Sequence, residues 1–220
     1  MGTEVAEAKR KSTSSGDETK AKILDATLQT LKEEGIVGTS ARVIARAGDF
    51  NQALIFYHFG SVDDAIIAAV GRMSERRLAN HRAKLEQATS LPDLIRVARD
   101  LHSDDSANDN MTVLTQAFAG AAGHDEMGPK LYAQLEPWSE LVADTIERVL
   151  GNAPGAGAVP NDAIAQAISA MFLGIELLDD LDPTRDHATA LFDALQSLAE
   201  LLDDLLATPL LEMLMPSRSD

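Results

Sequence analysis

The stretch TSARVIARAGDFNQALIFYHF, residues 39–59, predicts two short helices joined by a tight turn. Thr39 or Ser40 can cap the first helix, whose residues Val43 and Ile44 would face inward. The pair Gly48-Asp49 is typical of a turn, and Asn51 can cap a second helix that ends near His58. The whole stretch is therefore the pattern of a helix-turn-helix.

A longer amphipathic helix is expected before this stretch, over about residues 18–34. Its apolar side chains recur at helical spacing on one face, and Gly35 and Gly38 follow it. Gly60 ends the helix-turn-helix, and Ser61-Val-Asp-Asp64 resembles a capping box that opens a further long helix. We therefore expect a three-helix DNA-binding domain over residues 18–70.

The remainder of the chain shows helical periodicity and no strand pattern. The fold class is therefore predicted to be all-α, with an N-terminal three-helix helix-turn-helix head, a larger C-terminal helical bundle and about nine helices. Pro137 should kink or split a helix expected over residues 129–150. The predicted organisation comprises a flexible tail (1–17), the head (18–70), a helical ligand-binding and dimerisation domain (71–207) and a C-terminal tail (208–220).

Composition narrows the possible classes of protein. The chain contains no cysteine, which excludes disulfides and thiolate metal sites. It has no signal-like leader and no uninterrupted apolar run of membrane-spanning length, so we expect a cytoplasmic protein without a membrane partner. Residues 1–90 hold 13 Lys and Arg against 12 Asp and Glu, whereas residues 91–220 hold 6 against 23. This asymmetry favours head-first approach to DNA, although acidity serving only solubility explains the body equally well.

The second short helix carries groups suited to DNA. An α-helix fits the major groove, where the amides of Asn51 and Gln52 can bond to base edges and Ala53 can contact a thymine methyl. The hydroxyl of Tyr57 and the imidazole of His58 would meet phosphates at its far end. Further backbone contacts are expected from Thr39, Ser40, Arg42 and Ser61.

Residues 18–70 resemble the DNA-binding domain of the tetracycline-repressor (TetR) family. The resemblance is carried by Thr39, Ile44-Ala45, Gly48, Phe50-Asn51 and Ile55-Phe-Tyr-His-Phe59. It implies a homodimeric transcriptional repressor whose two heads bind a palindromic double-stranded DNA operator. It also implies release by a small-molecule effector, base contacts from residues 51–53, and backbone contacts from Thr39, Tyr57 and His58.

Two departures from the family pattern weaken the expected DNA binding. Asp63 and Asp64 stand where the family commonly has a lysine, and Asp49 stands where a glycine is usual. Carboxylates at these positions would repel phosphate. The alternative is a helical module that binds a small molecule or protein and has lost DNA binding.

Two heptad-like seams in the last two helices predict a dimer interface. Their spacing suits a four-helix bundle formed with a second copy, although both seams could also pack within one subunit. The expected interface residues are Ile164, Ile168, Met171, Ile175, Leu195, Leu198, Leu202 and Leu205.

The body also holds apolar side chains suited to a ligand pocket, and core packing explains them equally well. The candidates are Met111, Leu114, Phe118, Leu131, Trp138, Met171 and Phe172. No catalytic motif and no histidine pair at metal-ligand spacing is found. We therefore expect no enzyme activity, no metal and no cofactor.

Overall fold

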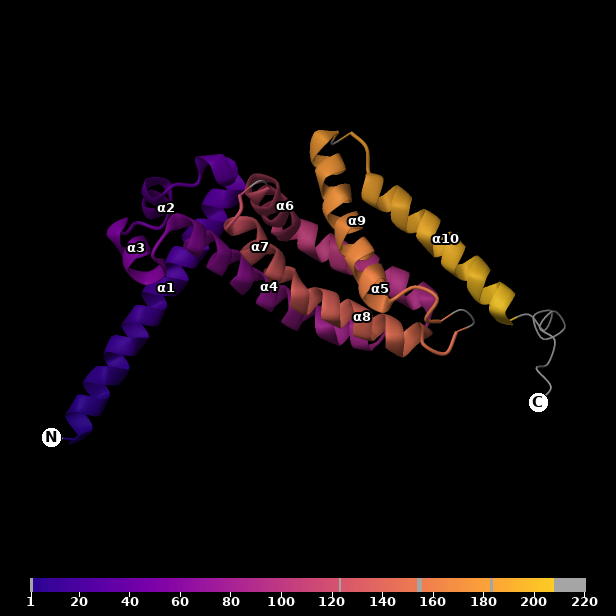
Figure 1. Cartoon of the computed structure of the whole chain (residues 1–220), viewed down its shortest axis with the longest axis horizontal. Helices are drawn as coiled ribbons and strands as arrows, with labels where there is room; N and C mark the ends of the chain where they lie inside the picture. The colour runs from indigo at the N-terminus through magenta and orange to yellow at the C-terminus, as the bar shows by residue number, and fades with distance from the viewer. Residues whose placement is uncertain (1, 123, 154–155, 183, 208–220) are drawn as a thin grey trace. The chain divides into compact units, whose positions relative to one another are not determined.

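The computed structural model describes residues 2–122, 124–153, 156–182 and 184–207, with side chains between residues 16 and 202 except residue 180. These residues form helices and no strand, so the prediction of an all-α fold is confirmed (Figure 1). The elements are α1 (Gly2–Gly38), α2 (Ala41–Ala47), α3 (Ala53–Phe59), α4 (Val62–Glu86), α5 (Leu91–Ala107), α6 (Asn110–Ala121), α7 (Met127–Tyr132), the 3-10 turn η1 (Ala133–Leu135), α8 (Glu136–Leu150), α9 (Asn161–Leu181) and α10 (His187–Ala207).

The helices form two compact units that differ from the sequence-based division. Unit 1 consists of Met1–Arg77 and Asp109–Glu136, and unit 2 consists of Leu78–Asn108 and Pro137–Asp220. Helices α6 and α7, expected in the ligand-binding body, therefore pack with the helix-turn-helix. Residues 2–17, expected in a tail, belong to α1, and the tail expected over 208–220 lies outside the described residues.

Unit 1 has a small core that fixes the helix-turn-helix. Ile23 and Ala26 of α1 pack with Ile44 of α2, Ile55 of α3 and Ala65 of α4. All five side chains are buried, so α2 and α3 are held against the first helix by apolar contacts. These contacts leave the opposite faces of the two short helices in solvent.

Helix α6 joins unit 1 through its contact with the end of α1. The side chain of Ile36 packs directly against Gly120 of α6. A Cβ added to Gly120 would lie 1.8 Å from Ile36 Cγ2, so no larger residue fits there. Lys32 forms an ion pair with Asp109 just before α6. This close packing explains why a segment predicted to line a ligand pocket belongs to the same unit as the helix-turn-helix.

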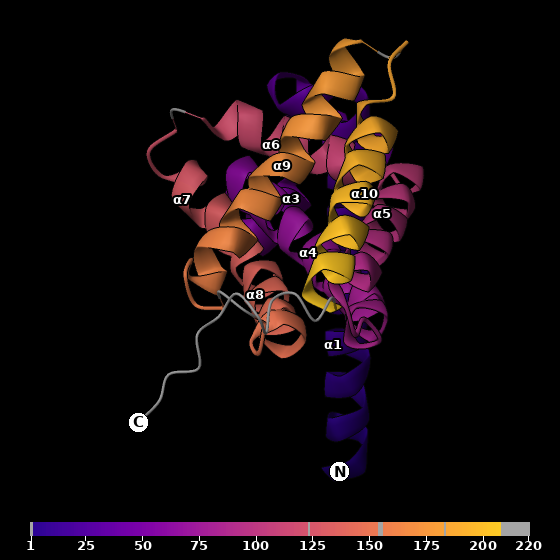
Figure 2. The same cartoon turned by 90° about the vertical axis from the view of Figure 1, so that its right-hand side faces the viewer.

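Unit 2 is built from the end of α4 with α5, α8, α9 and α10. Ser90 caps α5, because its Oγ accepts a hydrogen bond from the Asp93 N–H at 3.2 Å. The helix expected over 129–150 divides into α7, η1 and α8 just before Pro137, where a proline is tolerated in a first helical turn. Helix α10 packs along α5 and contacts α9 (Figure 2).

Helix α9 is apolar on more than one face. Its stretch Asn161–Asp179 has a mean hydropathy of 1.2, and 28% of it is buried. By length and composition this stretch could cross a membrane, and the bent pair of α3 and α4 meets the same criterion. In unit 2, α9 packs its buried face against α8 through Ala165, Ile164 and Ile168.

Candidate nucleic-acid interface and ligand cavity

The turn between α2 and α3 brings the two helices into a fixed relation. Asp49 adopts a left-handed backbone conformation with φ of 49°, which aspartate tolerates better than most residues. Gly48 permits a close approach, since a Cβ there would lie 2.2 Å from the Phe50 ring and 2.9 Å from Ala26 Cβ. The Asp49 carbonyl also accepts a hydrogen bond from Lys22 Nζ at 3.3 Å. An aspartate therefore fills the usual glycine position without breaking the turn.

Helix α3 presents a polar and aromatic face to solvent. Ile55 is fully buried, and Leu54 and Phe59 pack against the core. On the other side, Phe56 is 50% exposed and Tyr57 is 80% exposed. Large apolar side chains left exposed on a short helix are typical of a binding surface.

The residues expected to contact bases begin this exposed face. Asn51, Gln52 and Ala53 are all exposed. The Asn51 side-chain oxygen accepts a hydrogen bond from the Ala53 N–H at 2.9 Å, which starts α3 and fixes the carboxamide. Gln52 makes no side-chain cap, so its amide is available to bond to a base edge.

The expected backbone contacts occupy different environments. Tyr57 is exposed and its ring lies edge-on to the half-buried His58, with centroids 4.9 Å apart. Ser40 is exposed and caps α2, where its Oγ accepts from the Val43 N–H at 3.4 Å. Thr39 is buried, and its hydroxyl donates to the Gly35 carbonyl at 2.7 Å. Thr39, unlike Tyr57, His58 and Ser40, therefore points its hydroxyl toward the protein, where it bonds to a carbonyl in the last turn of α1.

Two arginines of α2 lie beside the start of α3. Arg42 and Arg46 are exposed, and both line a shallow hollow that Gln52 also borders. Arg42 was among the residues expected to contact DNA, whereas Arg46 was not. The spacing of four residues on one helix places both guanidinium groups on the same face, and this spacing could have identified Arg46.

The start of α4 carries the aspartates that depart from the TetR pattern. Ser61 Oγ donates to Asp64 Oδ2 at 2.7 Å and accepts from the Asp64 N–H at 3.0 Å. Lys130 Nζ of α7 lies 3.4 Å from Asp64 Oδ1. The Ser61 hydrogen bond and Lys130 lower the pKa of Asp64, so the carboxylate is charged. The positive charge of Lys130 partly offsets this negative charge. Asp63 is exposed.

Comparisons with known proteins agree with this geometry. Residues 23–69 match the family model described as bacterial regulatory proteins, tetR family. This match spans the helix-turn-helix and the start of α4. An uncharacterized HTH-type transcriptional regulator of Mycobacterium tuberculosis is 23% identical over 159 residues, which cover 70% of this chain and 77% of the relative. The family match and this relative support a DNA-binding regulator, and residues 23–69 are similar to the TetR-family helix-turn-helix.

Solved structures extend the fold similarity to most of the chain. A putative TetR-family regulator from Rhodococcus sp. has a TM-score of 0.69 at 17% identity, over 83% of this chain and 98% of that chain. The multidrug binding protein EbrR complexed with imidazole has a TM-score of 0.57 at 23% identity, over 83% and 90% of the two chains. At these identities the likeness establishes the TetR-family fold alone.

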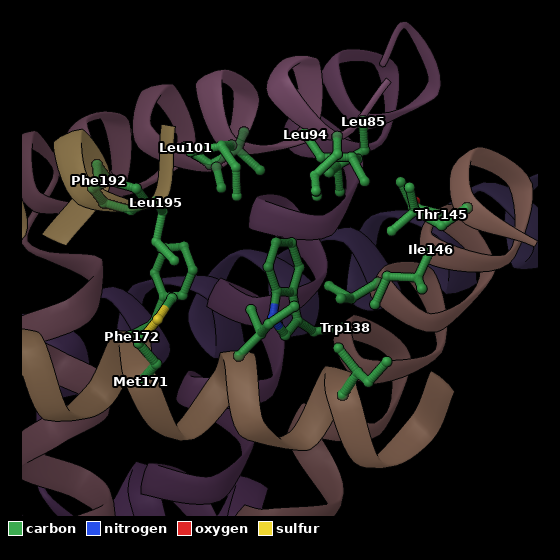
Figure 3. A pocket seen from close by; sticks show the side chains of 17 residues that line it. Leu85, Leu94, Leu101, Trp138, Thr145, Ile146, Met171, Phe172, Phe192 and Leu195 are labelled. Carbon is green, nitrogen blue, oxygen red and sulfur yellow. The ribbon is translucent and has the colours of Figure 1, made fainter. Parts of the chain in front are cut away.

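Unit 2 contains an apolar cavity of about 250 Å³. Side chains from α5, α8, α9 and α10 converge around Trp138 (Figure 3). Trp138, Met171 and Phe172 were expected to line a pocket, and all three line this one. Met111, Leu114, Phe118 and Leu131 do not line it, because α6 and α7 pack within unit 1.

The expected dimer residues of α9 and α10 are largely turned inward. Ile164, Ile168, Met171 and Leu195 line the cavity, and Ile175 is buried. The most apolar face of an amphipathic helix packs toward the core. Here the end of α4, together with α5 and α8, forms the surface within the same chain that this face packs against. Leu198 and Leu202 are exposed, at 51% and 39%. The side chain of Leu205 lies outside those that the structure describes.

A second face of α9 is exposed and consists of small and apolar residues. It is displaced by one position from the expected seam, and no atom lies within 4 Å of a Cβ built on Gly174. The stripe is defined by Ala163, Ala167, Ala170, Gly174, Leu177 and Leu181. Helix α10 likewise exposes Leu198, Leu201 and Leu202.

Proposed function

We propose that this protein is a homodimeric, cytoplasmic repressor that a small-molecule effector releases from a palindromic DNA operator. The observation that carries the proposal is the exposed face of α3, where Gln52, Ala53 and Tyr57 stand clear of the core. A helix so exposed, at the end of a rigid turn, has the form that enters a major groove.

Base and backbone contacts divide along this face. Gln52 is proposed to bond to adenine through both amide groups, with Asn51 and Ala53 contacting neighbouring bases. Tyr57, His58 and Ser40 are proposed to hold phosphate oxygens, with Arg42 and Arg46 supplying positive charge. Thr39 and Ser61 remain candidates, and their hydroxyl protons are already donated to Gly35 and Asp64.

The proposed dimer uses the displaced stripe of α9 with the exposed leucines of α10. Small side chains at Ala167, Ala170 and Gly174 allow two helices to approach closely, and burying the adjacent leucines supplies apolar stabilisation. A second copy of the same chain also explains why only 28% of the apolar stretch of α9 is buried within one chain.

A variant with Ala167→Arg tests the dimer, because a guanidinium in the stripe would be buried against its symmetry mate. We expect the molar mass from light scattering to fall to that of one 23.5-kDa chain. Ala107→Arg, at an exposed position of α5, is the matched control and should leave the dimer intact. A monomeric native protein, or equal behaviour of the two variants, would reject this interface.

The proposed effector site is the cavity around Trp138. A concave, mostly apolar space among helices is the usual form of a small-molecule site. The multidrug binding protein EbrR has the same fold and was crystallised with a small molecule, which supports ligand binding by this architecture.

Selection of bound duplexes from a random DNA pool tests DNA recognition. We expect one palindromic sequence to be enriched, with affinity that falls steeply as salt rises because phosphate contacts release counterions. The double variant Arg42→Ala/Arg46→Ala should reduce that salt slope by about 2 per head, roughly 0.9 for each lost phosphate contact. Arg82→Ala, exposed on α4, is the control. Failure to bind any duplex at low salt would support a module without DNA binding.

A further inference from the structure

The walls of the cavity in unit 2 carry almost no polar chemistry. Among the lining side chains that the structure describes, the polar groups are the indole N–H of Trp138 and the hydroxyl of Thr145. The Thr145 hydroxyl donates to the Leu141 carbonyl at 2.7 Å. Thr145 can therefore accept a hydrogen bond from a ligand, but its proton is already used. Within the described part of the chain, no Asp, Glu, Lys or Arg lines the cavity.

Two arginines in the surrounding helices are engaged elsewhere. Arg148 donates to the Ala88 and Leu85 carbonyls at 2.6 and 2.7 Å, so its guanidinium caps the end of α4. Arg99 pairs with Asp193 at 2.6 Å. Neither arginine is free to hold an anionic ligand.

His102 lies behind two aromatic rings of the cavity wall. Its ring contacts those of Phe172 and Phe192, each with centroids 5.7 Å apart. Burial lowers the pKa of His102, an effect that the nearby Asp179, Asp105 and Asp186 only partly oppose. A neutral imidazole provides no fixed cation for a carboxylate at this end of the cavity.

Cavity size limits the ligand as strongly as its chemistry does. A cavity of 150 Å³ accommodates benzene, so the about 250 Å³ here corresponds to roughly ten non-hydrogen atoms. Trp138, Phe172 and Phe192 supply ring faces and edges, which pack well against a compact ring or branched hydrocarbon.

We propose that the cavity of unit 2 binds an uncharged, compact apolar molecule of this size and rejects organic carboxylates and ammonium ions of the same shape. Transfer of an unpaired charge into such a site is far more costly than transfer of a hydrocarbon. This proposal names the class of ligand for the effector site proposed above. Only its consequence for DNA release rests on the proposed function.

Trp138 provides a direct readout, because it is the single tryptophan of the chain and lies in the cavity wall. Three probes of one shape are titrated into the full-length protein: 4-tert-butyltoluene, 4-tert-butylbenzoate and 4-tert-butylbenzylammonium. We expect the neutral probe to change the tryptophan emission saturably. Each charged probe should bind about tenfold more weakly or worse.

Cavity variants show where the probe binds. Ala98→Phe places a ring in the cavity and should abolish the response to 4-tert-butyltoluene, whereas Ala107→Phe, exposed on the same helix, should retain it. Ile168→Ala enlarges the cavity and should also retain binding, which guards against misfolding of the first variant. Circular dichroism confirms the fold of each variant.

The outcomes separate ligand class from regulation. Equal or tighter binding of a charged probe, an undiminished response in Ala98→Phe, or no response to the neutral probe up to its solubility limit would overturn the ligand class. DNA release is measured separately with a selected duplex. Saturable binding of the neutral probe without any effect on DNA would support the ligand class and reject its role in release.

Discussion

The outer face of α3 and the cavity of unit 2 place aromatic side chains in opposite relations to water. Tyr57 and Phe56 are exposed on a helix of seven residues. Phe172 and Phe192 are instead buried in the cavity wall, where their ring centroids lie 6.0 Å apart. The first region presents groups that the fold leaves uncovered. The second presents a space that packing leaves unfilled, so the specificity of the proposed ligand site would depend on several helices at once.

The largest expected effect compares a phenylalanine from each region. Phe192→Ala removes a fully buried ring and should lower the free energy of unfolding by about 3–5 kcal/mol. Phe56→Ala removes a half-exposed ring and should cost below about 1 kcal/mol. Urea unfolding followed by circular dichroism measures both free energies. Similar losses for the two variants would show that Phe56 and Phe192 do not differ in burial as described.

A second test concerns sequence preference at the exposed face. Gln52→Ala should weaken binding to the selected duplex by about 1–3 kcal/mol, because a bidentate contact to a base is lost. Affinity for random duplexes should stay the same. Fluorescence anisotropy measures both, with Gln87→Ala at the end of α4 as the control. An equal loss on random DNA would assign Gln52 to backbone binding.

Charge at the start of α4 should affect all DNA sequences alike. Asp64→Asn keeps the bond from Ser61 and removes a negative charge, so affinity should rise by roughly two- to fivefold at low salt. Lys130→Ala should lower affinity by a similar factor, and the loss should shrink in the Asp64→Asn background. Asp63→Asn is the control for the coupling to Lys130, because Lys130 contacts Asp64. The effect of Lys130→Ala should therefore be unchanged in the Asp63→Asn background. Strictly additive effects would mean that Lys130 does not act through Asp64.

The smallest expected effect is on stability as a function of pH. Burial lowers the pKa of His102 below its ordinary value of 6.5, so near pH 6 the unfolded chain binds a proton that the folded chain does not. Stability should therefore fall as pH decreases from about 7.5 to 5.5. His102→Leu should reduce this slope in thermal unfolding; an unchanged slope would assign it to other groups.

The exposed region was largely predictable from the sequence, and the enclosed region was not. The helix-turn-helix depends on local patterns, such as the turn at Gly48-Asp49 and the apolar spacing of Ile44 and Ile55. The effect of Pro137 on its helix is also local. By contrast, the packing of α6 with α1 depends on the fit of Ile36 against Gly120, which lie 84 positions apart and show no periodic relation.

The α9 face was harder to predict for a different reason. Its sequence is apolar nearly all round, so periodicity alone does not say which face packs internally. The seam with the largest side chains lines the cavity, and the adjacent stripe of alanines and Gly174 is left exposed. Between Ala163 and Ile175, the volume of each side chain, rather than its hydropathy, separates the two faces; Leu177 and Leu181 continue the exposed stripe as large side chains.

One consequence of this arrangement concerns how α9 tolerates change. Successive positions of a helix are rotated by about 100°, so neighbours such as Ala167 and Ile168 serve different surfaces. Saturation mutagenesis of residues 161–179 should therefore yield two interleaved classes of variant, one altered in subunit association and the other in the choice of small molecule. Each trait could then diverge while the other is preserved.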